Sequence, residues 1–113
     1  MNFHGVDVQR QFRRMRELAP EAYRAFLDFD GKAFAPGALD AKTKELIAVG
    51  IAQITQCPWC IDAHTARAAK AGASDKEIGE VIFVSMAMAA GAAWAHGGLA
   101  LQCVEEHANA KKA

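Results

Sequence analysis

Residues 39–78 read LDAKTKELIAVGIAQITQCPWCIDAHTARAAKAGASDKEI, and this stretch decides the fold class. Asp40 is a residue of the type that caps helix N-termini, so we expect a helix from this position to about Gln56. Cys57 or Gln56 then caps a further helix, with Pro58 in its first turn, where proline is well tolerated. The stretch therefore predicts two successive helices that meet at a pair of cysteines.

The sequence before this stretch also predicts helices. Apolar residues recur at helical spacing in the first segment, at Val8, Phe12, Met15 and Leu18. Pro20 fits the first turn of a second helix, whose inner face includes Tyr23, Phe26 and Leu27. Gly31 to Gly37, with Pro36 between them, is expected to be a loop.

The sequence after the cysteine pair completes the helical pattern. Gly72 is expected to end the helix that starts at Pro58. Residues 74–77, SDKE, match a capping box, so another helix begins there and runs toward Gly91. A sixth helix follows Gly91, or the fifth continues with a bend. Because no segment alternates like a β-strand, we predict a single all-α domain of about six helices over residues 1–113.

Composition and charge favour no particular class of partner. Thirteen basic and thirteen acidic residues balance, so nothing favours nucleic acid or an anionic membrane surface as a partner. The N-terminal sequence MNFHGVDVQRQFRRMREL is charged throughout and lacks the apolar run of a secretory signal, so we expect a cytoplasmic protein. In that compartment a close cysteine pair indicates catalysis or metal binding rather than a structural bridge.

Val81 to Val104 is a long stretch without Asp, Glu, Lys or Arg. Its length would suffice to cross a bilayer. Its composition favours a buried helix instead, because the stretch is rich in alanine, which is weakly hydrophobic, and contains three glycines, His96 and Gln102. A chain of this size has little material to surround such a helix, so we expect a homo-oligomer and no membrane association.

The nine residues QCPWCIDAH combine two thiols and an imidazole on one helical stripe. With a helix starting at Pro58, Cys57 and Cys60 lie at its first turn, and His64 follows one turn later on the same face. The positive end of the helix dipole stabilises a thiolate, and a nearby imidazole can exchange its proton. The second thiol can then close an internal disulfide, which predicts a redox centre.

Three alternative interpretations of the cysteine pair stay open at this point. The two thiols and the imidazole of His64 are good zinc ligands, although only His96, Cys103 or a carboxylate would complete such a site. Cys-Pro-Trp-Cys also occurs in thioredoxin-type loops, but these follow a strand that this sequence does not predict. Finally, the cysteines can simply be small buried apolar residues.

The remaining histidines and cysteine are assigned structural or open roles. His96 either approaches the site from another helix or is hydrogen-bonded within its own. Cys103 is expected to be a helix-packing residue rather than a third redox partner. His4 and His107 are expected at the surface, and Trp59 is expected to pack or to contact a subunit or reductant.

Residues 39–78 resemble the core of the AhpD-like alkylhydroperoxidase and carboxymuconolactone decarboxylase family, in which a glutamate on one helix precedes Cys-x-x-Cys-x-x-x-His on the next. The resemblance extends more loosely to residues 88–101, MAAGAAWAHGGLAL. It implies an all-helical fold that assembles as trimers or hexamers. It also implies a peroxidatic disulfide cycle that uses no metal, haem, flavin or other cofactor.

The resemblance assigns the catalytic residues to Cys60, Cys57, His64 and Glu45. It implies that Cys60 attacks the hydroperoxide, that Cys57 resolves the sulfenic acid into a disulfide, and that His64 and Glu45 relay protons. The position of Cys57 nearer the helix N-terminus favours it as the more acidic thiol, so the assignment of roles stays open on physical grounds. Trp59 stands where lipoyl-linked members of the family carry a relay histidine.

The function expected from this resemblance is that of a thiol-dependent alkylhydroperoxidase. Its partners would be a hydroperoxide substrate and a dithiol reductant, either a lipoyl or a thioredoxin-like protein. One alternative is a non-enzymatic redox sensor or oligomeric scaffold. The other is an enzyme like carboxymuconolactone decarboxylase, although those members act without this cysteine pair.

Overall fold

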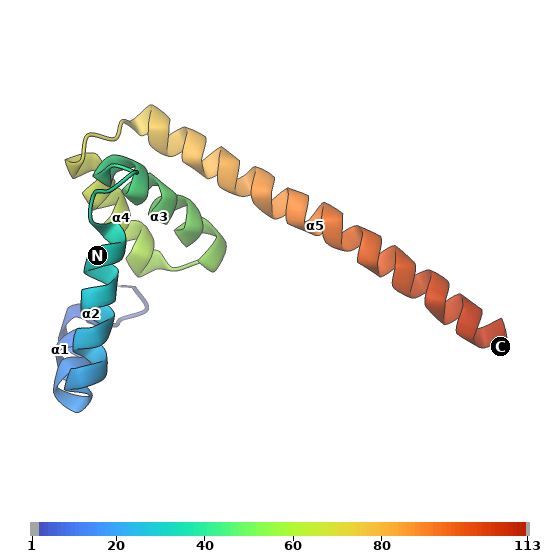
Figure 1. Ribbon diagram of the computed structural model, residues 1–113, viewed down its shortest axis with the longest axis horizontal. Helices are drawn as coiled ribbons and strands as arrows, with labels where there is room; N and C mark the ends of the chain where they lie inside the picture. The colour runs from blue at the N-terminus through green and yellow to red at the C-terminus, as the bar shows by residue number, and fades with distance from the viewer. Residues whose placement is uncertain (1–2, 113) are drawn as a thin grey trace.

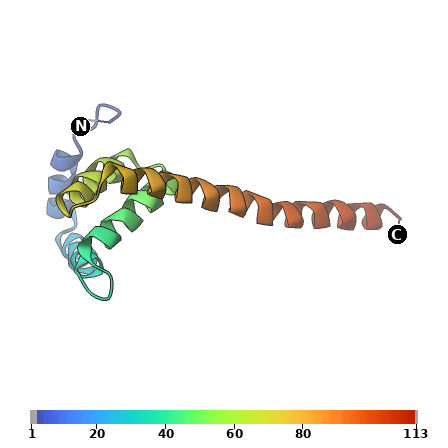
Figure 2. The ribbon, with the colours of Figure 1, turned by 90° about the horizontal axis from the view of Figure 1, so that it is seen from above.

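The computed structural model describes residues 3–112 and is all-α, as predicted (Figure 1). It contains five helices, which are α1 (Val8–Leu18), α2 (Pro20–Phe34), α3 (Ala41–Thr55), α4 (Pro58–Lys70) and α5 (Asp75–Lys112). α3 packs against both α4 and the first part of α5, while α1 packs against α2. Most of α5 projects away from the other helices, as two perpendicular views show (Figures 1 and 2).

The helix starts predicted from capping chemistry are confirmed. The carboxylate of Asp40 accepts a hydrogen bond of 2.8 Å from the backbone N–H of Thr43 at the start of α3. Ser74 and Glu77 form a reciprocal capping box at the start of α5, with distances of 3.1 Å and 2.9 Å. These bonds satisfy backbone donors that would otherwise lack a partner in the first helical turn.

A small core lies where α3 meets α4 and α5. Val49 and Ala52 of α3 and Ala68 of α4 are buried. On another face of α3, the hydroxyl of Ser85 donates to the carbonyl oxygen of Gly50 at 3.1 Å. A Cβ built on Gly50 would lie 3.2 Å from that hydroxyl, so the glycine lets α3 and α5 approach closely.

The loop predicted over residues 31–37 begins later than expected, because α2 continues through Gly31 to Phe34. Glycine lowers helix stability by about 1 kcal/mol relative to alanine, but it does not by itself end a helix. The extra turn is stabilised from α3, since the ammonium of Lys44 donates to the carbonyl oxygens of Ala33 and Ala35 at 2.9 Å and 2.6 Å. These contacts hold the end of α2 next to the start of α3.

The prediction of a sixth helix was wrong, because α5 is one helix of 38 residues that passes Gly91 without interruption. Residues 75–112 contain no proline, and alanine is abundant on both sides of Gly91. A Cβ built on Gly91 would meet no other described residue within 4 Å, so no neighbouring side chain crowds the helix at this point. At about 1.5 Å per residue, α5 is about 57 Å long.

The projecting helix makes the chain unusually extended. Its radius of gyration is 20.0 Å, whereas a compact chain of this length has a radius of gyration of about 13 Å. The expected inner faces of α1 and α2 are also open, with Leu18 and Phe26 exposed by 74% and 61%. α5 is long and apolar enough to cross a membrane by length and composition, a test that core helices of soluble proteins also pass.

Candidate active site

The two cysteines lie at a tight junction between α3 and α4. Gln56 adopts a left-handed conformation, with φ of 56°, and ends α3. Of the two predicted cap residues, Cys57 is the N-cap of α4, and Pro58 occupies the first turn as predicted. The sulfur of Cys57 accepts a hydrogen bond of 3.2 Å from the backbone N–H of Cys60. One thiol therefore takes the place of a capping hydroxyl, and the second thiol lies one turn away.

Both cysteines are free thiols and are half-buried. The pKa of Cys60 is raised to about 11, first because its thiol hydrogen-bonds to Cys57. Burial and the charge of a thiolate on Cys57 raise this pKa further, whereas a backbone hydrogen bond lowers it. At neutral pH the resting side chain of Cys60 is thus a protonated thiol, and it needs a base before it can act as a nucleophile.

His64 is positioned by a carboxylate from the neighbouring helix. Its Nδ1 lies 2.6 Å from Oε2 of Glu45, and both side chains are largely shielded from solvent. Because a carboxylate accepts hydrogen bonds, this contact places the proton on Nδ1 and leaves Nε2 able to accept one. The imidazole follows Cys60 by four residues on the same helix, which puts both side chains on one face of α4.

A stacked aromatic ring fixes the imidazole from a further direction. The rings of Phe34 and His64 lie 5.0 Å apart between centroids with an interplanar angle of 19°. Phe34 is the last residue of α2, the helix end that Lys44 holds. No sequence signal points to Phe34 or Lys44, since Phe34 lies in the predicted loop and lysine is an ordinary surface residue type.

Trp59 packs against the N-terminal segment of the chain. Phe3 meets its indole edge-on at 6.0 Å, and His4 lies at 6.1 Å between ring centroids. His4 and Gly5 both have positive φ, and the N–H of Val6 donates to the carbonyl oxygen of Phe3, which forms a tight turn. Nε1 of Trp59 is buried and has no hydrogen-bond partner among residues 3–112.

The candidate residues His96, Cys103 and His107 lie on α5, away from this site. His96 is on the projecting part of α5, where its Nδ1 is 3.3 Å from the carbonyl oxygen of Ala92. Of its two predicted alternatives, the structure therefore supports hydrogen bonding within its own helix. Cys103 is half-buried on the same helix, and His4 and His107 are exposed as predicted. Within the described residues, no three His, Cys, Asp or Glu side chains form a group suited to a metal ion.

Comparison with known proteins places this site in a family. Residues 20–105 match the carboxymuconolactone decarboxylase family. An uncharacterised protein of the cox locus of Paracoccus denitrificans is 50% identical over 82 residues, which are 73% of this chain and 74% of that protein. An uncharacterised protein of Cupriavidus necator is 33% identical over 76% of each chain.

Two crystal structures share the fold. A carboxymuconolactone decarboxylase family protein of Legionella pneumophila is 36% identical, with a TM-score of 0.69 over 73% of both chains. A family protein of Thermotoga maritima, for which a part in an antioxidative response has been suggested, is 30% identical. Its TM-score is 0.63 over 70% of this chain and 68% of that one. The chain belongs to the carboxymuconolactone decarboxylase family, as its resemblance to AhpD-like proteins implied.

Proposed function

We propose that this protein is a thiol-dependent alkylhydroperoxidase that works through a Cys57–Cys60 dithiol and disulfide cycle. The observation that carries this proposal is the arrangement of three groups at the start of α4. Cys57 caps the helix, Cys60 lies one turn on, and His64 follows with its ring held by Glu45. Two neighbouring thiols with an oriented base suit a two-electron oxidation that ends in a disulfide.

The first half of the reaction oxidises one sulfur and cleaves the peroxide. His64 accepts the proton of Cys60, and the thiolate attacks the terminal oxygen of the hydroperoxide. A sulfur–oxygen bond forms, the oxygen–oxygen bond breaks, and the departing alkoxide takes a proton from His64 to leave as the alcohol. Cys60 is then a sulfenic acid, and Glu45 has stabilised the imidazolium that existed between the two proton transfers.

The second half restores the thiols. Cys57 attacks the sulfur of the sulfenic acid, a disulfide forms, and water leaves. An external dithiol then reduces the disulfide by exchange and becomes a disulfide itself. The net reaction converts a hydroperoxide and a dithiol into an alcohol, water and an oxidised dithiol, with no bound cofactor. A lipoyl or thioredoxin-like protein of the cytoplasm would supply the dithiol, and the working form would be a homo-oligomer, a trimer or hexamer.

Two physical arguments bear on which cysteine reacts first. The raised pKa of Cys60 and the capping position of Cys57 both favour the first thiolate on Cys57. In contrast, only Cys60 shares its helical face with His64 at a spacing of one turn, so it is better placed to lose its proton as peroxide arrives. We assign the attack to Cys60, because His64 lies one helical turn away and can remove the proton of its thiol when the peroxide arrives.

A peroxide-consumption assay with several dithiol reductants tests the proposed activity. An enzyme should consume many equivalents of an alkyl hydroperoxide per chain when a dithiol is in excess. A redox sensor would consume about one equivalent of peroxide per chain and then stop, even with a dithiol in excess. Consumption limited to one equivalent with lipoyl and thioredoxin-like donors alike would refute the enzymatic proposal.

A further inference from the structure

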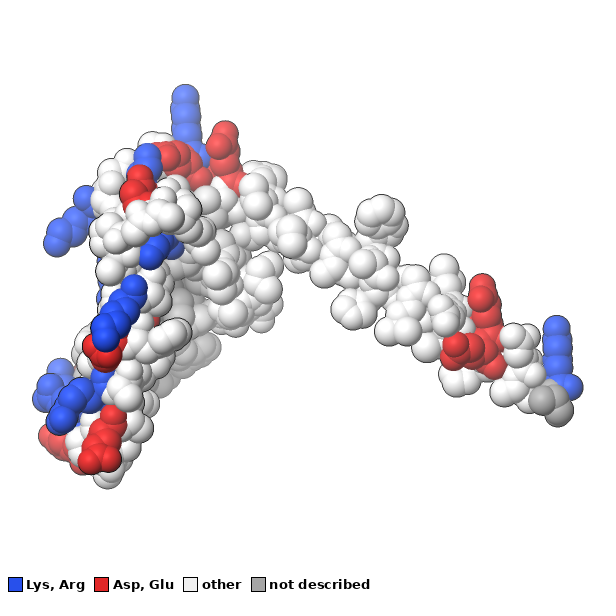
Figure 3. Space-filling model, viewed as in Figure 1, with Lys and Arg blue, Asp and Glu red and all other residues white. Residues whose placement is uncertain are grey.

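The outer part of α5, residues 89–104, exposes apolar side chains on all sides. Trp94 is 85% exposed, Leu101 67%, Val104 63% and Leu99 60%. No Asp, Glu, Lys or Arg occurs between Val81 and Val104, and the space-filling view shows this length of α5 without charge (Figure 3). A helix that is apolar around its whole circumference is stable when neighbours cover it on more than one side.

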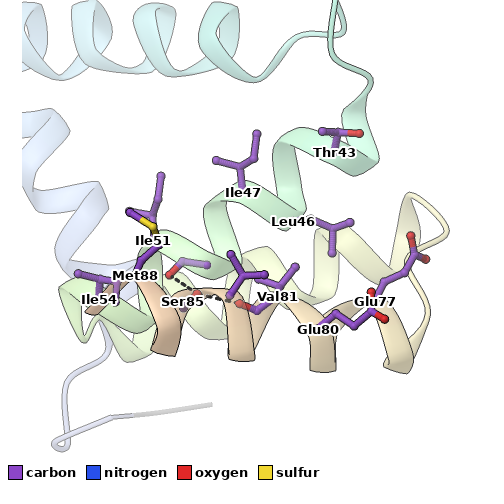
Figure 4. A pocket seen from close by; sticks show the side chains of 12 residues that line it. Thr43, Leu46, Ile47, Ile51, Ile54, Glu77, Glu80, Val81, Ser85 and Met88 are labelled. Carbon is purple, nitrogen blue, oxygen red and sulfur yellow. Dashed lines mark hydrogen bonds between the residues drawn. The ribbon is translucent and has the colours of Figure 1, made fainter. Parts of the chain in front are cut away.

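An apolar groove lies between α3 and the first part of α5. The groove has a volume of about 520 Å³, and Figure 4 shows its lining side chains. Its apolar walls are formed mainly by Leu46, Ile47, Ile51, Ile54, Val81 and Met88. Charged side chains occur only toward one end, at Glu77 and Glu80, whereas Met88 lies at the end from which α5 projects. The apolar surface of the groove therefore continues directly into the apolar surface of the projecting part of α5.

The solvent-accessible area of the chain is larger than expected for a stable monomer and is typical of a subunit of an oligomer. The chain exposes 8861 Å², whereas a compact monomer of 12.1 kDa exposes about 6,000 Å². The excess of about 2,800 Å² per chain, or about 5,600 Å² for two chains, matches the upper part of the range that obligate homodimers and larger assemblies bury. The projecting helix cannot cover the groove of its own chain, because α5 is straight and uninterrupted from Asp75 to Lys112 (Figures 1 and 2).

We propose that residues 89–104 of α5 from a second copy of this chain occupy the groove between α3 and α5. Both surfaces are largely apolar, and neither carries an Asp, Glu, Lys or Arg side chain where they would meet, so their contact buries no unpaired charge. Gly91, Gly97 and Gly98 have open space around them, and such small residues let a second helix approach closely. This interface extends the assembly part of the proposed function and does not depend on the thiol chemistry.

A lipid bilayer is the competing occupant, and the residues fit it less well. Trp94 lies in the middle of the uncharged stretch, whereas tryptophan in membrane helices concentrates near the two interfaces. His96 and Gln102 would place polar groups in hydrocarbon, where they are costly. The first part of α5 also packs on α3 through the bond between Ser85 and Gly50, so a membrane span would bring α3 with it.

Light scattering on detergent-free protein at several concentrations tests the interface. We expect an oligomer for the natural sequence. Ile51→Asp in the groove and Leu101→Asp on the projecting helix should each weaken association by about 30-fold or more, the effect of a central interface residue. These side chains are 56% and 67% exposed in one chain, so each variant should keep its helical circular dichroism. Ile51→Ser and Leu101→Ser serve the same comparison if an aspartate variant unfolds.

Leu18→Asp is the matched control, because Leu18 is 74% exposed on α1 and lies outside both surfaces. It should leave the assembly within about threefold of the natural affinity, as most residues outside the hot spot do. Mixing Ile51→Asp with Leu101→Asp should restore part of the association, since each pair then contains one natural groove and one natural helix. A monomeric natural protein, recovery only in membranes, an unaffected Ile51→Asp variant, or no recovery on mixing would each overturn the proposed interface.

Discussion

Oε2 of Glu45 on α3 lies 2.6 Å from Nδ1 of His64 on α4, across the short junction that carries both cysteines. This contact joins residues 19 positions apart and fixes the orientation of the imidazole, with the ring of Phe34 stacked on it. Because Nδ1 is occupied, Nε2 is the nitrogen left to exchange a proton in the proposed reaction. The junction between two helices thus fixes the orientation of the imidazole.

Removing this base should slow the oxidation of the thiols. We expect His64→Ala to reduce the rate of reaction with an alkyl hydroperoxide by about 10²- to 10⁴-fold, the usual loss when general acid–base help is removed. Glu45→Gln keeps a hydrogen-bonding side chain but no negative charge to stabilise the imidazolium, so it should slow the reaction less. Stopped-flow measurement of a single oxidation reads both rates. Glu21→Gln, an exposed change on α2, is the control and should react at the natural rate.

Cys57 should restrain the reactivity of Cys60 at neutral pH. The pKa of Cys60 is raised to about 11 first by its hydrogen bond to Cys57. A raised pKa means that less of the Cys60 thiol is ionised at neutral pH. Removing the hydrogen bond to Cys57 should therefore lower the pKa and increase the thiolate fraction of Cys60. We therefore expect Cys57→Ala to alkylate faster at Cys60 with iodoacetamide near pH 7. Equal rates with and without the Cys57 sulfur would contradict the hydrogen bond as the main cause.

The close approach of α3 and α5 should depend on Gly50. A Cβ at this position would lie 3.2 Å from the hydroxyl of Ser85 and 3.3 Å from a methyl group of Val81. Gly50→Val adds a Cβ and two methyl groups to this contact, so it should reduce the free energy of unfolding by about 1–3 kcal/mol, as overpacking does. Urea denaturation measures the loss. Gly31→Val is the matched control, because nothing lies within 4 Å of that Cβ position on α2.

Features that depend on local chemistry could be predicted from the sequence. Asp40, Cys57 and the Ser74 capping box mark helix starts in the structure because each cap bonds a backbone group only two or three residues away. The ends of α2 and α5 were harder to predict. A glycine lowers helix stability but does not by itself end a helix, and α2 and α5 continue through Gly31 and Gly91.

Features that depend on distant contacts could not be predicted. The spacing of Cys57, Cys60 and His64 placed them on one helix, and the resemblance to AhpD-like proteins added Glu45. Phe34 stacks on His64, and Lys44 bonds the carbonyl oxygens of the residues on either side of Phe34, which no local pattern reveals. The packing of Phe3 and His4 on Trp59 likewise joins segments more than fifty positions apart in the sequence.

Mass spectrometry after a brief pulse of alkyl hydroperoxide tests the disulfide cycle most directly. The natural protein should lose two hydrogens per chain and show a peptide cross-linked between Cys57 and Cys60. Cys57→Ser should gain one oxygen at Cys60, as a sulfenic acid that dimedone traps, and Cys60→Ser should stay unmodified. A sulfenic acid on Cys57 in the Cys60→Ser variant would reverse the assigned roles, and the absence of any Cys57–Cys60 disulfide in the natural protein would contradict the cycle itself.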